Sequence, residues 1–156
     1  MNAAADNART VAVRFYTLAE AGGSARLRQA CMLTEQAYLA GERVLVWLDS
    51  PDEMARFDEL LWTFGDRSFV PHEPLQADPA ACEAAVQLHA GPLPQQAIGA
   101  FQTLVALRAQ PAGESLRFAS VIEVIDAEPE CRNAGRTRFR WYREHGATPQ
   151  HVEVNA

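Results

Sequence analysis

The chain has 156 residues, a formal net charge of −6 and 48% hydrophobic residues, which is the composition of an ordinary globular protein. This length is enough for one well-buried domain and short for two. The acidic balance disfavours general attraction to phosphate backbones, although it allows a local basic surface. Because the longest apolar runs fall far short of a membrane span, no membrane partner is expected.

The residues that most often bind metals or carry catalysis show no recognisable spacing. Cys31, Cys82 and Cys131 form no CxxC pair and leave an odd count, so we expect neither a disulfide framework nor a zinc site. Free thiols fit a reducing, cytoplasmic location. The chain contains no HExxH and no GxSxG motif, and we therefore expect no metal site and no catalytic site.

The first half of the chain alternates strand and helix signals. Residues 1–9 are small and polar and are expected to be a flexible N-terminus. Residues 10–18 alternate apolar and polar side chains, which predicts a strand, and residues 25–40 predict a helix that ends at Gly41. Residues 43–48 are mostly apolar and predict a strand buried on both faces.

A helix with a strong start signal follows. Ser50 lies at the N-cap position, with Pro51 at the first helical position and Glu53 three residues after the serine, as in a capping box. The apolar residues then recur at helical spacing: Met54, Phe57, Leu61 and Phe64. Trp62 lies about a quarter-turn off this stripe.

The second half of the chain predicts the remaining elements. These are a long loop at 65–82, strands at 84–89, 103–108 and 120–126, a last helix at 128–145 and a loose C-terminal tail at 147–156. Strands that alternate with helices predict βαβ units and a parallel sheet. We therefore expect a single α/β domain over residues 10–146, a three-layer Rossmann-like domain with a mainly parallel five-stranded sheet.

Such a fold raises the possibility of a nucleotide-binding Rossmann-like enzyme. The first strand–helix turn, residues 19–24, has neither GxGxxG nor GxxxxGK[ST], so the chain shows no backbone cradle for phosphates and we expect no cofactor. Asp49 ends the second strand at a place that could bind a ribose hydroxyl. The simpler reading is an aspartate between a strand and a capped helix.

The last predicted helix has an arginine-rich face. Four residues fall together on a helical wheel of about 100° per residue: Arg132, Arg136, Phe139 and Arg143. Arginines one turn apart can converge on carboxylates, and the ring offers an apolar contact beside them. This face suits an acidic peptide with an apolar end. The alternatives are a solvated basic face near a helix C-terminus and direct nucleic-acid binding, which the overall acidity disfavours. Arg138 points toward the apolar side of the wheel.

A second surface combines Trp62 with the loop residues Phe69, Val70 and Pro71. A tryptophan off the core stripe beside large apolar loop residues predicts an exposed apolar patch, and such patches mark interfaces. The alternative is that the loop folds back and buries Phe69 and Val70.

Three runs of the sequence carry a family resemblance. The run AGERVLVWLDSPDEMARFDELLWTFGDRSFVPH resembles the signature region of the DNA polymerase III chi subunit family, and VRFYTL and EVID followed by GRTRFRWYR agree with it in the same order. The resemblance covers most of residues 11–145, and residues 78–119 contribute only a strand pattern.

The resemblance implies a non-catalytic adaptor with two protein partners. One is the acidic C-terminal tail of single-stranded DNA-binding protein, which ends in a phenylalanine carboxylate. Arg136 matches the key arginine position for that tail, Phe139 the key aromatic position, often tyrosine in relatives, and Arg132 a second basic position. The other partner is the psi subunit of the clamp-loader complex, which the resemblance assigns to the run containing Phe69. DNA would be contacted only through the tail-bearing partner.

Overall fold

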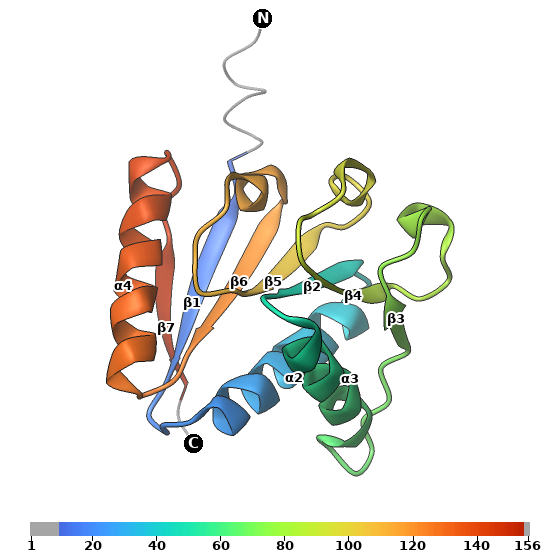
Figure 1. The fold of residues 1–156 in the computed structure, drawn as a ribbon, viewed down its shortest axis with the longest axis horizontal. Coiled ribbons are helices and arrows are strands. Elements are labelled where there is room, and N and C mark those ends of the chain that lie inside the picture. The colour runs from blue at the N-terminus through green and yellow to red at the C-terminus, as the bar shows by residue number, and fades with distance from the viewer. Residues whose placement is uncertain (1–9, 155–156) are drawn as a thin grey trace, which may run out of the picture.

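The structure is a computed structural model and describes residues 10–154, which form a parallel seven-stranded sheet with three α-helices (Figure 1). The strand order is β3-β4-β2-β5-β6-β1-β7, and each neighbouring pair is parallel. The strands are β1 Ala12–Leu18, β2 Val44–Leu48, β3 His72–Pro74, β4 Val86–Ala90, β5 Thr103–Leu107, β6 Ser120–Ile125 and β7 Gln150–Val154. The helices are α2 Gly23–Leu39, α3 Pro51–Thr63 and α4 Pro129–Glu144. The predicted α/β class and parallel sheet are confirmed.

The predicted strand number was wrong, because the sheet has seven strands where five were expected. The two additional strands lie at opposite edges of the sheet. β3 is only three residues long and ends in a proline, so it gives a weak strand signal and was included in the loop predicted at 65–82. β7 lies in the segment 147–156 that was expected to be a loose tail, and it pairs with β1. The predicted flexible segment 1–9 lies outside the described residues.

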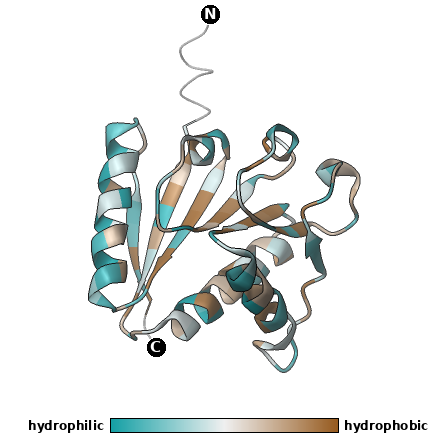
Figure 2. Ribbon diagram, in the orientation of Figure 1, coloured by the Kyte–Doolittle hydropathy of each residue, from teal (hydrophilic) through white to brown (hydrophobic). Residues whose placement is uncertain are grey.

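Helices pack against both faces of the sheet. Along β2, Val44, Val46 and Leu48 belong to one buried cluster, which also contains residues of α2 and α3. Leu45 and Trp47 point to the opposite face and join a second cluster that contains residues of α4. Figure 2 shows hydrophobic colour along the central strands and hydrophilic colour over much of α4. One side of α4 is therefore left for solvent or a partner.

The start of α3 follows its sequence signal. The Ser50 hydroxyl accepts a hydrogen bond from the Glu53 backbone N–H at 3.2 Å, and Pro51 occupies the first helical position. Phe57 and Leu61 of the predicted stripe are fully buried, and Met54 and Phe64 pack against the same cluster. The direction of α3 places Trp62 and the following loop at the molecular surface.

Candidate functional site

A cavity of about 570 Å³ lies between α4 and the sheet edge formed by β1 and β7. We call it the α4 groove. Its lining residues are Phe15, Thr17, Ile125, Arg132, Gly135, Arg136, Phe139, Arg140, Arg143, His151 and Glu153. All four residues predicted from the helical wheel are among them: Arg132, Arg136, Phe139 and Arg143. The structure thus brings the predicted residues together in one concave site, together with Arg140, which the helical wheel had placed near the edge of the same face.

The floor of the α4 groove is apolar. Phe139 is partly buried, and its ring centroid lies 5.1 Å from that of Phe15, which in turn makes an edge contact with Tyr142. Gly135 brings α4 close to the sheet, since a Cβ atom there would lie 2.2 Å from Cδ1 of Ile125. A larger residue at this position would have to displace the Ile125 side chain or the helix itself.

The α4 wall of the groove is strongly cationic. Arg132, Arg136, Arg140 and Arg143 are all exposed, and among residues 10–154 none of them forms an ion pair. Of these four arginines, Arg136 donates one side-chain hydrogen bond, from Nη1 to Asn133 Oδ1 at 3.1 Å. The guanidinium donors are therefore available to the oxygen atoms of a ligand.

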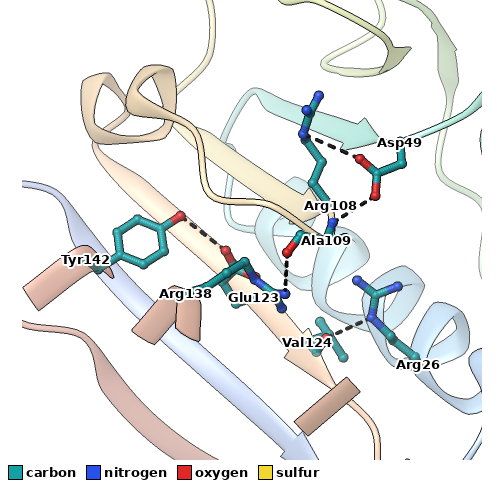
Figure 3. Close-up of polar contacts among 8 residues, drawn as sticks. All are labelled: Arg26, Asp49, Arg108, Ala109, Glu123, Val124, Arg138 and Tyr142. Atoms are coloured by element: carbon teal, nitrogen blue, oxygen red, sulfur yellow. Dashed lines mark hydrogen bonds and ion pairs between the residues drawn. The ribbon is translucent and has the colours of Figure 1, made fainter. Parts of the chain in front are cut away.

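A buried polar network holds α4 on the sheet (Figure 3). Arg138 Nε donates to Glu123 Oε1 at 2.9 Å, and Tyr142 Oη donates to Glu123 Oε2 at 3.2 Å. Arg138 Nη1 also donates to the Ala109 carbonyl. Burial raises the pKa of Glu123, and the Arg138 charge opposes that rise. The predicted inward direction of Arg138 is confirmed, and its partner Glu123 fixes which side of α4 faces the core.

Both carboxylate oxygens of Asp49 contact neighbouring residues (Figure 3). Its Oδ2 accepts the Ala109 backbone N–H at 2.8 Å, and its Oδ1 lies 3.7 Å from Arg108 Nε. The Arg108 guanidinium in turn lies 4.1 Å from the Trp47 ring centroid. These contacts tie the end of β2 to the segment after β5, which supports the simpler reading of Asp49.

The second predicted surface is only partly exposed. Trp62 is 43% exposed and Phe69 is 67% exposed, and their ring centroids lie 5.5 Å apart. We call these two residues the aromatic patch. Pro71 is half-buried beside it. Val70 is 0% exposed and belongs to the α2–α3 core cluster, so its predicted place on the surface was wrong. Phe69 and Val70 are neighbours in the loop that leads into β3, and the structure buries Val70 against the core while it leaves Phe69 exposed.

The buried side chain of His72 packs against Trp62 of the aromatic patch. Its Nδ1 lies 2.7 Å from the Val70 carbonyl oxygen, and its Nε2 lies 2.9 Å from Asp58 Oδ1. Its ring centroid is 4.1 Å from that of Trp62. The histidine thus links the loop to α3, whereas the sequence had placed it only at the end of the run SFVPH in the second predicted surface.

Sequence analysis also missed the strand side of the α4 groove. Thr17, His151 and Glu153 come from β1 and β7, which are far from α4 in the chain. The available signal was the alternation of polar His151 and Glu153 with half-buried Val152 and Val154. That period of two is typical of a strand with one covered face.

Within residues 10–154, no group of three or more histidine, cysteine, aspartate or glutamate side chains is placed to hold a metal ion. In the same part of the chain, no helix combines the length and apolar character that crossing a membrane requires.

Comparison with known proteins places the chain in a family. The family model for "DNA polymerase III chi subunit, HolC" matches residues 11–150. The DNA polymerase III subunit chi of Pseudomonas aeruginosa PAO1 is 34% identical over 134 residues, which cover 86% of this chain and 90% of that protein. The Escherichia coli K12 subunit chi is 28% identical over 126 residues, covering 80% and 83% respectively. The chain belongs to the DNA polymerase III chi subunit family, as its sequence resemblance predicted, and has an accessory role in DNA replication.

Proposed function

We propose that this protein is a non-catalytic, cytoplasmic adaptor with a Rossmann-like fold that binds the acidic C-terminal tail of single-stranded DNA-binding protein in the α4 groove. The observation that carries the proposal is the combination of four arginines with an apolar floor in one cavity. Tail carboxylates would meet Arg132, Arg136 and their neighbours, and the terminal apolar side chain would pack on Phe139. DNA would be reached through this partner and not by direct contact.

We also propose that the aromatic patch is the binding site for the psi subunit of the clamp-loader complex. Exposed aromatic residues are enriched at protein interfaces, where one buried ring often carries much of the binding energy. Phe69 would be the anchor because it is the more exposed of the two rings. Trp62 packs beside it and would widen the contact, and Pro71 would border it. The protein would then connect the clamp loader to the protein that coats the template strand.

The test of tail binding is a calorimetric titration with a synthetic peptide that contains several aspartates and a C-terminal phenylalanine. The free-acid peptide is expected to bind more tightly than the same peptide with an amidated C-terminus, because a charge-assisted hydrogen bond contributes about 1.5–3 kcal/mol. Affinity is also expected to fall as salt is added, since salt screens the arginine charges. Equal affinities for the two peptides would show that the terminal carboxylate does not contribute to binding.

Replacing Phe69 with alanine is expected to weaken psi binding strongly, because a buried aromatic anchor typically contributes about 2 kcal/mol or more. The fold is expected to persist, since Phe69 is largely exposed in the free protein. Surface plasmon resonance with purified psi measures the loss, and circular dichroism checks the fold. Leu39→Ala is a matched control, because Leu39 is also an exposed apolar residue but lies on α2. Psi binding that survives the Phe69 change would place the interface elsewhere.

A further inference from the structure

One carboxylate faces the cationic wall of the α4 groove. Glu153 lies on β7 and lines the groove together with the arginines of α4. It is exposed, and in the described part of the chain it forms no ion pair with any of them. His151 lies two residues earlier on the same face of β7, where its Nε2 is 2.7 Å from Thr17 Oγ1. The β7 wall therefore presents a negative charge and a histidine that is engaged with the neighbouring strand.

We propose that Glu153 is a specificity-determining residue of the α4 groove that weakens the binding of acidic peptides and selects how they lie in it. This inference rests on the proposed tail-binding function. A peptide between the two walls is attracted to the arginines and repelled by Glu153. Its carboxylates must therefore lie against α4, and the residue that faces β7 must be uncharged. The apolar terminal side chain then reaches the floor at Phe139 and Phe15.

The size of the effect follows from Coulomb's law. Like charges that face each other across a solvated groove repel and are only partly screened by salt, so removing one is expected to change affinity about two- to fivefold. Glu153→Gln keeps the size of the side chain and one carbonyl acceptor, replaces the other oxygen with an NH2 donor, and removes the charge. This variant is expected to bind the aspartate-rich free-acid peptide about two- to fivefold more tightly than the unmodified protein does. A gain of affinity is informative because loss of a merely structural contact would weaken binding.

The experiment is a double-mutant cycle by calorimetry. The second peptide replaces the aspartates with asparagines and keeps the free C-terminal carboxylate. Glu153→Gln is expected to have a markedly smaller effect on this peptide, because most of its negative charge is gone. The control is Glu130→Gln, which makes the same change in net charge at an exposed residue of α4 outside the groove. It is expected to leave both affinities nearly unchanged.

Each outcome bears on the proposal. If Glu130→Gln raises the affinity for the aspartate-rich peptide as much as Glu153→Gln does, the effect is one of net charge and the proposed role of Glu153 is wrong. Weaker binding by Glu153→Gln would show that the carboxylate orients the arginines, which also overturns it. If Glu153→Gln changes nothing while Arg136→Ala weakens binding, the inference fails and the proposed function stands. If the unmodified protein binds neither peptide, the proposed function fails and the inference falls with it.

Discussion

Replacing Arg138 with alanine is expected to destabilise the protein by about 3–5 kcal/mol, because it leaves the buried Glu123 carboxylate without its charged partner. Both side chains are almost fully buried, at 3% and 2% exposure, and Nε lies 2.9 Å from Oε1. Urea denaturation followed by circular dichroism measures the loss. Arg136→Ala is the matched control, since Arg136 lies on the exposed side of the same helix, and its effect on stability is expected to be small.

The loss of folding stability in Arg138→Ala is also expected to depend on pH. Burial raises the pKa of Glu123, and removing Arg138 removes a charge that opposes this rise. A carboxyl group whose native-state pKa is raised favours the folded state at low pH and loses that contribution as pH rises through the native-state pKa. The stability gap between Arg138→Ala and the unmodified protein is therefore expected to narrow from neutral to mildly acidic pH. A gap that widens on acidification would show that the Glu123–Arg138 pair does not control this stability.

Replacing Arg136 with alanine is expected to weaken binding of the acidic free-acid peptide about ten- to a hundredfold, the size of one lost charge-assisted hydrogen bond. Arg136 sits near the middle of the cationic wall, beside Gly135 and one turn before Arg140. The loss is expected to shrink for the amidated peptide if Arg136 contacts the terminal carboxylate. Calorimetric titration of both peptides against both proteins measures this difference.

The control for Arg136 must be an arginine outside the groove. Arg138 is unsuitable because its removal is expected to damage the fold through Glu123. Arg117 is exposed, lies outside the α4 groove and carries the same charge. Arg117→Ala is expected to leave peptide affinity close to that of the unmodified protein. A similar loss in the two variants would attribute binding to overall charge and remove Arg136 from the proposed site.

The amino-acid sequence by itself determined the local features of this protein. Ser50 and Pro51 predicted the start of α3, and the helical period placed Arg132, Arg136, Phe139 and Arg143 on one face of α4. Arg138 was placed on the opposite side for the same reason. These predictions were correct because helix caps and side-chain direction depend on backbone geometry within a few residues.

The tertiary structure alone decided which distant segments meet. It paired residues 150–154 with β1 as an edge strand, which created the second wall of the α4 groove and placed Glu153 in it. It also joined Arg138 to Glu123, and it buried Val70 while leaving Phe69 exposed. An edge strand is covered less than a central strand, so its hydrophobic signal is weak. The burial and pairing of these residues depend on packing between segments that are far apart in the chain, which a local pattern does not specify.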